Sequence, residues 1–289
     1  MNTATHGRIV VGVDGSEHAA RALRWAVDQA VLENRGLALV HAIAPTEADW
    51  LAAASGGNEA AGTSESVREM VARTREDIQR KAPGLDVAEV VRIGDAREVL
   101  IEASRDAAMV VLGSRGRGRL RSLLLGSVSA AVSQHAACPV VIHRPGNPGI
   151  VRNGVLVGVD ESERSVPVLE FAFRVAAQRD LPLTVMHCYS EVLVPAGPVV
   201  TVLPPVDVED QRRGLAEVLA GFGERYPEVR TQVEVSRGVP AVDLAHRAEK
   251  MNLLVVGAHH GGVAGALLFG SVSTGALEHA SCPVAVVPV

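Results

Sequence analysis

Glycine, serine and arginine residues between positions 113 and 129 form the stretch of this sequence best suited to hold a ligand. The residues concerned are Gly113, Ser114, Arg115, Gly116, Arg117, Gly118, Arg119, Gly126, Ser127, Val128 and Ser129. Glycines let backbone N–H groups come close to a ligand, and arginines supply positive charge. A helix that begins near Ser127 adds unpaired N–H donors and the positive end of its dipole. This combination favours a polyphosphate ligand.

A purely structural role for the same residues is the alternative. Gly113 and Gly116 could shape a turn, Gly126 and Ser127 could cap a helix, and the arginines could face solvent. The conjunction of fixed glycine positions with several arginines between them favours anion binding over each of these roles.

The elements that would position this stretch alternate along the chain. Apolar runs typical of buried strands cover residues 8–14, 37–43, 87–93, 109–112 and 139–142, and helical patterns cover residues 19–32, 64–81, 96–104 and 127–135. This alternation predicts βαβ units and a parallel sheet. Ligands of such sheets bind beyond the carboxyl ends of the strands. Asp14 and Gly113, which end the first and fourth strands, therefore belong to one crevice.

The ends of these elements carry specific turn and cap signals. Ser16 is expected to start the first helix, and Gly36 to end it. Ser127 or Ser129 is a candidate cap of the fourth helix, and residues 45–63 read as a loop. His41 lies within an apolar run, which indicates a core histidine with a satisfied hydrogen bond.

The second half of the chain repeats the first. Asp160 follows Asp14 by 146 residues, and His187 follows His41 by the same interval. Gly257 and Gly270 keep the spacing of Gly113 and Gly126. Repetition at a fixed interval is the signature of duplicated structural units. We expect two domains, residues 1–147 and 148–289, joined by a linker within residues 144–153.

The spacing G-x2-G-x9-G-S of residues 113–127 resembles the nucleotide-binding signature of the universal stress protein family, in its ATP-binding branch. The chain is similar to a tandem member of that family. The resemblance implies two tandem α/β domains of Rossmann-like type, each with a five-stranded parallel sheet in strand order 3-2-1-4-5. It implies ATP as the ligand, with or without Mg²⁺, and a regulatory, stress-adaptive role.

The resemblance also extends the candidate site. In the family, the acidic residue that matches Asp14 lies against the nucleoside, and the backbone at the position that matches Ala42 faces the adenine. Gly12, two residues before Asp14, is a further candidate. The corresponding candidates of the second copy are Gly158, Asp160, Cys188, Glu191, Gly257, His260, Gly261, Gly262, Gly270, Ser271, Val272 and Ser273.

The second copy departs from the signature. His260 stands where the first copy has Gly116, and the arginines are missing. Gly261 and Gly262 could restore the close backbone approach. Losing one or two charge-assisted phosphate contacts would weaken binding by about one to three decades, so the second site should be the weaker one.

Composition narrows the function classes. The 289 residues carry a net charge of −5, which argues against a nucleic-acid binder. No membrane span or secretory signal is predicted, and the three cysteines show no metal-ligand spacing. A cytoplasmic location is the simplest expectation.

No P-loop or nucleophile elbow occurs, and no catalytic set stands out. We therefore expect a nucleotide-binding regulatory protein, not an enzyme, although slow ATP hydrolysis is compatible with this sequence.

The resemblance also implies how the chain assembles. Family members pair through their fifth strands, so the two halves are expected to form an intramolecular pseudo-dimer, with further homo-oligomerisation. The segments at residues 45–63 and 190–205 are expected to be irregular and to lie beside the glycine loops, where ATP could order them for a partner. The alternative is a nucleotide-free interaction or scaffold module of the same fold.

Overall fold

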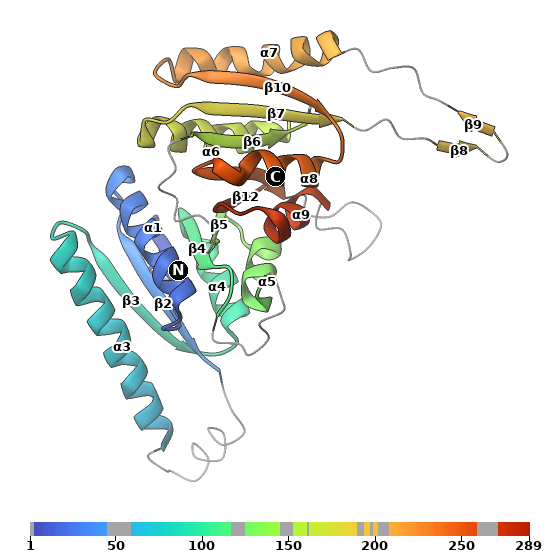
Figure 1. The fold of residues 1–289 in the computed structure, drawn as a ribbon. Coiled ribbons are helices and arrows are strands. Elements are labelled where there is room, and N and C mark those ends of the chain that lie inside the picture. The colour runs from blue at the N-terminus through green and yellow to red at the C-terminus, as the bar shows by residue number, and fades with distance from the viewer. Residues whose placement is uncertain are drawn as a thin grey trace. The chain divides into compact units, whose positions relative to one another are not determined.

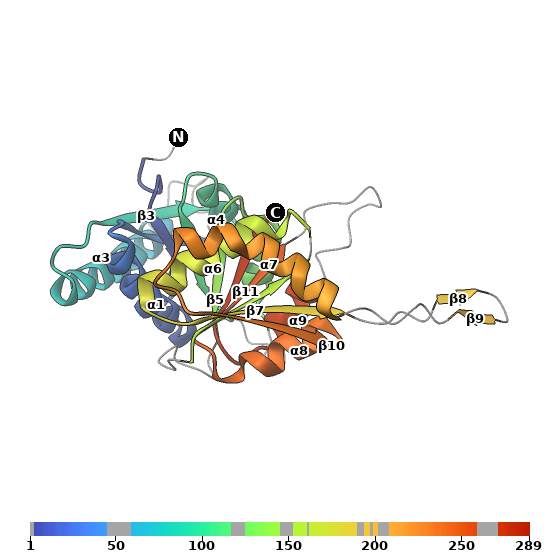
Figure 2. The ribbon, with the colours of Figure 1, turned by 90° about the horizontal axis from the view of Figure 1, so that it is seen from above.

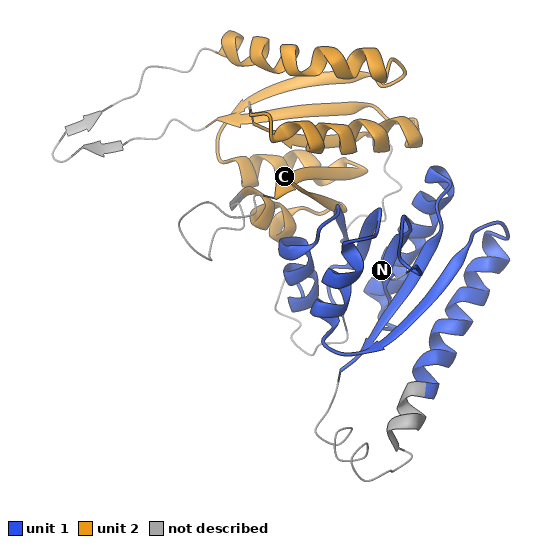
Figure 3. Cartoon of the chain, turned by 180° about the vertical axis from the view of Figure 1, so that it is seen from behind, with its two compact units in different colours: residues 1–145 blue, residues 146–289 orange. Residues whose placement is uncertain are grey.

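The computed structural model describes residues 3–44, 59–116, 125–144, 153–160, 162–189, 194–196, 199–201, 208–258 and 271–289. The chain divides into two compact units, residues 1–145 and residues 146–289 (Figure 3). The expected boundary between residues 147 and 148 lies outside the described residues. Each unit is an α/β structure with its own parallel sheet.

The first unit alternates strands and helices as the sequence predicts (Figure 1). Its elements are β1 (Ile9–Gly12), α1 (Glu17–Glu33), β2 (Leu37–Ile43), α3 (Glu59–Lys81), β3 (Val87–Ile93), α4 (Ala96–Ser104), β4 (Met109–Gly113), α5 (Ser127–His135) and β5 (Val140–His143). Their strands pair in the order β3-β2-β1-β4-β5, and every pair is parallel. The expected order 3-2-1-4-5 is confirmed.

The second unit repeats this topology. Its elements are β6 (Val155–Val159), α6 (Ser165–Arg179), β7 (Leu183–Tyr189), β8 (Val194–Ala196), β9 (Val199–Thr201), α7 (Val208–Arg225), β10 (Thr231–Arg237), α8 (Pro240–Arg247), a 3₁₀ turn (Ala248–Lys250), β11 (Leu253–Ala258), α9 (Ser271–His279) and β12 (Val284–Pro288). The main sheet has the order β10-β7-β6-β11-β12, again parallel throughout.

Helices cover both faces of each sheet, so the central strands can be apolar on both sides. In the first unit α1 and α3 pack on one face and α4 and α5 on the other (Figure 1). Figure 2 shows α6 and α7 on one face of the second sheet and α8 and α9 on the other. All five residues of β4 are buried. No described helix is long and apolar enough to cross a membrane.

Three expectations about element boundaries are wrong. Asn34, not Gly36, takes the left-handed position that ends α1, with φ 50°, because its short polar side chain tolerates that conformation. The helix expected over residues 64–81 begins earlier, at Glu59. Within the segment 190–205, β8 and β9 pair as antiparallel strands, so that segment is not wholly irregular.

Candidate functional site

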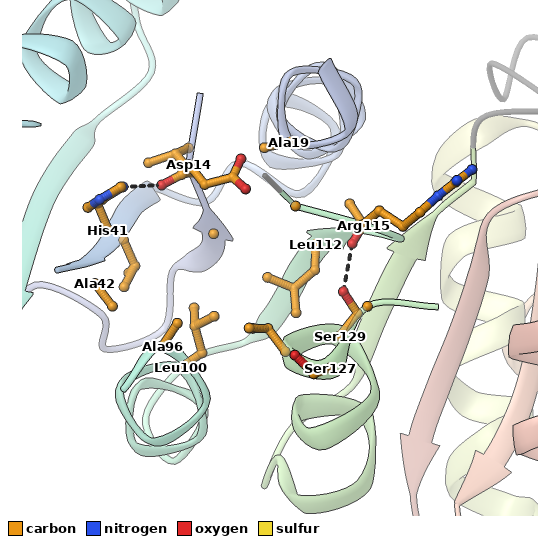
Figure 4. A pocket seen from close by; sticks show the side chains of 17 residues that line it. Asp14, Ala19, His41, Ala42, Ala96, Leu100, Leu112, Arg115, Ser127 and Ser129 are labelled. Carbon is orange, nitrogen blue, oxygen red and sulfur yellow. Dashed lines mark hydrogen bonds between the residues drawn. The ribbon is translucent and has the colours of Figure 1, made fainter. Parts of the chain in front are cut away.

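A cavity of about 400 Å³ opens at the carboxyl ends of β1, β2 and β4 in the first unit (Figure 4). Its lining residues come from three strands, the loops that follow them, and the N-terminal parts of α1, α4 and α5. They are Gly12, Val13, Asp14, Ala19, Val40, His41, Ala42, Ala96, Leu100, Leu112, Gly113, Arg115, Gly116, Gly126, Ser127, Val128 and Ser129. The structure thus brings together most of the candidates of the first copy.

One end of this pocket is apolar. Figure 4 shows Ala42, Ala96 and Leu100 together, with Leu112 beside them. A Cβ at Gly12 would lie 2.6 Å from the Cδ2 atom of Leu112, so the glycine makes room for that side chain. The wall formed in this way suits a flat, apolar group such as an aromatic ring.

The opposite end is formed by the start of α5. Gly126 is the N-cap residue, with φ −76° and ψ 152°, and it has no side chain to cap the helix. Its N–H donates to the Ser114 carbonyl at 2.8 Å. The expected capping by Ser127 or Ser129 is wrong. The Ser129 hydroxyl instead donates to the Gly113 carbonyl at 2.7 Å, which ties α5 to the end of β4 (Figure 4).

Other helices of the same unit begin differently. The Ser16 hydroxyl accepts the Ala19 N–H at 3.2 Å at the start of α1, and the Asp95 carboxylate accepts the Arg97 N–H at 2.8 Å at the start of α4. The first N–H groups of a helix have no acceptor within the helix. The glycine cap therefore leaves the donors of α5 without a capping side chain, next to the pocket.

Asp14 lies beside the glycine loop at residue 116. One carboxylate oxygen, Oδ1, accepts the Ser16 N–H at 2.9 Å. The other, Oδ2, faces Gly116, where a Cβ would lie only 2.6 Å from it. Glycine at position 116 therefore lets the acidic side chain and the loop approach each other closely.

Of the arginines in the glycine loop, the structure describes Arg115. The guanidinium of Arg115 points away from the other labelled side chains of the pocket (Figure 4). Its Nε is buried and has no hydrogen-bond partner among the described residues. Arg117, Gly118 and Arg119 lie outside the described residues. Within the part of the site that is described, the positive electrostatic potential at the α5 end of the pocket therefore comes mainly from backbone N–H groups.

Ser114 does not line the pocket. Its side chain is fully buried, and its backbone N–H donates to the His143 carbonyl at 3.0 Å. This bond and the one from Gly126 N–H to the Ser114 carbonyl fix the loop between β4, β5 and α5. Ser114 thus helps to position the loop.

Two histidines support the strand ends in the same way in both units. His41 Nδ1 lies 2.5 Å from the Val13 carbonyl oxygen, and His187 Nδ1 lies 3.0 Å from that of Val159. A carbonyl can only accept, so each ring donates its Nδ1–H. Both side chains are buried. The interpretation of these residues as satisfied core histidines is confirmed.

Several candidates of the second copy occupy the corresponding positions of their own unit. Gly158 lies on β6, Cys188 on β7, Gly257 on β11, and Ser271, Val272 and Ser273 open α9. Burial, and next the nearby Asp243 carboxylate, raise the pKa of the Cys188 thiol to about 11. Glu191, His260, Gly261, Gly262 and Gly270 lie outside the described residues.

Asp160, like Asp14, accepts a backbone N–H from its own loop, and two serine hydroxyls also lie beside its carboxylate. Its Oδ1 accepts the Ser162 N–H at 3.0 Å and the Ser162 hydroxyl at 2.6 Å, and lies 2.9 Å from the Ser165 hydroxyl. The two copies therefore place the same residue type in different surroundings.

Some lining residues are absent from the sequence prediction. They are Val13, Ala19, Val40, His41, Ala96, Leu100 and Leu112. All except His41 are small or apolar and are indistinguishable from core residues in a single sequence. Ala96 and Leu100 have the i, i+4 spacing of one helix face, which is the signal that could have placed them together.

Metal coordination has no support among the described residues, which contain no group of three or more histidine, cysteine or acidic side chains arranged to hold an ion. Of the three cysteines, Cys138 and Cys282 are buried and all are free.

Comparisons with known proteins agree with this architecture. The model of the universal stress protein family matches residues 5–144 and 152–288. A universal stress protein of Mycolicibacterium smegmatis is 34% identical, with 99% of each chain covered. One of Mycobacterium tuberculosis strain H37Rv is 36% identical over 96% of this chain and 95% of its own. The crystal structure of a universal stress protein from Archaeoglobus fulgidus superposes with a TM-score of 0.72 at 18% identity, covering 97% and 98% of the two chains.

Proposed function

Because this chain belongs to the universal stress protein family, as a tandem of two such domains, we propose that its first unit binds ATP in the pocket between Asp14 and α5. The proposed role is regulatory and stress-adaptive, with the bound nucleotide as the signal. The observation that carries the proposal is the glycine-capped start of α5 at one end of the pocket.

The chemistry of the two pocket ends matches the two ends of a nucleotide. Backbone donors and the helix dipole at Gly126 to Ser129 suit phosphate oxygens. The wall that contains Ala42, Leu100 and Leu112 suits a purine ring. Asp14 lies between these ends, where its carboxylate can accept hydrogen bonds from ribose hydroxyls. A cavity of about 400 Å³ is within the usual range for small-ligand sites.

The polar side chains of the pocket fit nucleotide binding without rapid hydrolysis, because their hydrogen-bonding groups are used within the protein. The lining histidine, His41, donates its Nδ1–H to a backbone carbonyl, and the Ser129 hydroxyl donates to another. Any Mg²⁺ would enter with the nucleotide, held mainly by phosphate oxygens and water. We expect phosphate release far below the ordinary enzymatic rate of roughly 1 per second.

The first test identifies the ligand. The purified full chain is denatured, the released nucleotide is identified by mass spectrometry, and the emptied protein is titrated with ATP by calorimetry. Released ATP or ADP, together with saturable ATP binding, is the expected outcome. An empty protein that gives no heat with ATP would favour the interaction module instead.

A substitution at Gly126 tests the proposed phosphate end without damage to the fold. The backbone of Gly126 is extended, and a Cβ there would make ordinary contacts at 3.4 Å with Arg115 Cα and Ser114 O. Gly126→Asp therefore supplies a good N-cap and should stabilise the unliganded protein by a few tenths of a kcal/mol. Its carboxylate would take the α5 donors and repel phosphate, so the stabilisation of the protein by ATP should vanish.

Gly126→Asn is the matched control, because it caps the same helix without charge. We expect it to bind ATP at least tenfold more tightly than Gly126→Asp, a difference of about 1.4 kcal/mol. Equal ATP affinity in the wild type and both variants would contradict the assignment of α5 to the phosphates.

A further inference from the structure

Four polar side chains lie next to one another at the end of β4, and each has a buried atom without a hydrogen-bond partner among the described residues. The atoms are His18 Nδ1, Ser114 Oγ, Arg115 Nε and His143 Nδ1. A Cβ at Gly113 would lie 2.8 Å from the Cβ of His18, and the Ser114 N–H donates to the His143 carbonyl at 3.0 Å. Buried polar groups without partners destabilise the arrangement that contains them.

Arg115 adds an uncompensated positive charge to this group. Its guanidinium forms no ion pair within the part of the chain that is described. Arg21, which faces the same histidine from α1, lies 3.0 Å from the Glu17 carboxylate. A partly buried charge is unfavourable without a counter-ion. The surroundings of Arg115 therefore favour an anion that the described residues do not supply.

His18 is the group most directly affected by this charge. Burial, and next the charges of Arg115 and Arg21, lower its pKa, whereas the carboxylates of Glu17 and Asp14 raise it. Across the same corner, a charge on His18 would act on the neighbouring His143 of β5 and lower the pKa of that residue. Because burial and the cations outweigh the two carboxylates, the pKa of His18 lies below 6.5 and the imidazole is mainly neutral at pH 7.

The backbone of Arg115 already lies at the phosphate end of the proposed site. Its Cα would be 3.4 Å from a Cβ at Gly126, the N-cap residue of α5. From this point the side chain extends away from the pocket (Figure 4). Rotation about the side-chain bonds alone would carry the guanidinium toward phosphates bound at α5. There it can donate the bidentate, charge-assisted hydrogen bonds that arginine forms with phosphate.

We propose that Arg115 turns toward the phosphates when a nucleotide binds to the first unit, and that His18 then takes up a proton from solvent. Phosphate oxygens supply the acceptors and the negative charge that the described surroundings of Arg115 lack. The movement removes a cation that opposes protonation of His18, so ATP binding and proton uptake are coupled. This inference rests on the proposed nucleotide site, and it makes the ATP affinity of that site dependent on pH.

The second unit has different residues at the corresponding positions. Ala258 and Val287 stand where the first unit has Ser114 and His143. Arg164 stands in place of the titrating histidine of α1, and an arginine stays protonated throughout the pH range of folded proteins. The coupling is therefore expected in the first unit and not in the second.

The experiment follows the protonation of His18 in the full chain by NMR of the histidine Cε1–H groups. The signal of His18 is identified by its loss in His18→Gln. Saturating ATP should raise the pKa of His18 in the wild type. Adenosine, which has no phosphates, should leave the pKa unchanged.

Arg115→Gln removes the charge that is proposed to move. Without ligand, its His18 should already have a higher pKa than in the wild type, and ATP should raise that pKa much less. Calorimetry should show about tenfold weaker ATP binding, because a charge-assisted contact is lost, with unchanged binding of adenosine. Arg115→Lys keeps a positive charge on a flexible side chain and should restore the ATP-induced rise.

Arg21→Gln is the matched control, because it removes another positive charge that acts on His18, one that is paired with Glu17 on α1. It should raise the pKa of His18 in the unliganded protein but keep both the ATP-induced rise and the ATP affinity. An ATP-induced rise as large in Arg115→Gln as in the wild type would show that Arg115 does not move, and would overturn the inference while leaving the nucleotide site intact. If the wild type binds no ATP, the proposed function itself fails.

Discussion

The first unit directs Asp14 at Gly116, whereas the second unit holds Asp160 within the loop that leads into α6. Both units share the same parallel strand order, and both acidic residues follow a buried strand. Ser165 and Pro167 of the second unit stand where the first unit has Ala19 and Arg21. A shared fold therefore does not give the two acidic residues the same surroundings, because loop and helix-start residues differ between the copies.

The ends of β4 and β11 differ in a related way. A Cβ at Gly113 would lie 2.6 Å from the backbone carbonyl carbon of His18, in the first turn of α1. A Cβ at Gly257 would meet side chains instead of backbone, at 3.2 Å from Val168 and 3.6 Å from Val289. Next to these glycines, His143 of β5 pairs in register with Gly113, and Val287 of β12 pairs with Gly257. The first unit is thus more tightly packed and more polar at this edge.

The largest expected effect is that of Gly113→Ala. The added methyl group clashes with backbone atoms of α1, which cannot move independently, so the first unit should lose about 3 kcal/mol of stability. Gly257→Ala is the control, and it should cost less than about 1 kcal/mol because Val168 can shift. Hydrogen exchange of the β4 amides reports the stability of the first unit, and exchange of the β11 amides reports that of the second. Equal losses of protection in the two variants would remove this contrast.

Acid should destabilise the first unit through His143. Burial, and next the charges of Arg21, Arg24 and His18, lower the pKa of this buried side chain from 6.5 to about 4. Above pH 6.5 the folded and unfolded states are both neutral. Between pH 6.5 and 4 the unfolded state takes up the proton first, so the free energy of unfolding falls by about 3 kcal/mol.

Urea unfolding followed by tryptophan fluorescence measures this loss, since both tryptophans, Trp25 and Trp50, belong to the first unit. His143→Val copies the residue of the second unit and should remove most of the decline between pH 6.5 and 4. A variant that loses stability with acid as steeply as the wild type would show that other groups cause the decline. His18, whose pKa is also lowered by burial and by Arg115, is the first alternative.

The smallest effect concerns the site itself. Gly116→Ala should displace the Asp14 carboxylate, because the new Cβ would lie 2.6 Å from Oδ2, a mobile atom at the end of a side chain. We expect ATP to bind the first unit about tenfold less tightly, with unchanged stability in the absence of ligand. His260→Gly, the reverse change in the second copy, should tighten the weaker class of site. Calorimetric titration that finds one uniform class in the wild type would contradict the predicted inequality of the two sites.

Much of the fold is predictable from the sequence for a simple physical reason. Strands such as 37–43 and 87–93, and helices such as 96–104 and 127–135, coincide with the observed elements because apolar periodicity reflects burial directly. Helix ends are less predictable. Asn34 ends α1 where Gly36 was expected, and Gly126 caps α5 where a serine was expected. Several neighbouring residues can take the same conformation at a helix end.

The sequence by itself determined that two α/β units follow one another, that Asp14 and the glycines of the first copy share one crevice, and that His41 and His187 are core residues. These conclusions depend on patterns local in sequence and on the rule that parallel strands end at one edge. Only the tertiary structure decided that Arg115 points out of the pocket, that Ser129 binds the Gly113 carbonyl, and that Asp160 is held by two serines. Side-chain direction depends on which partners packing brings within hydrogen-bond distance, and spacing along the chain does not specify that.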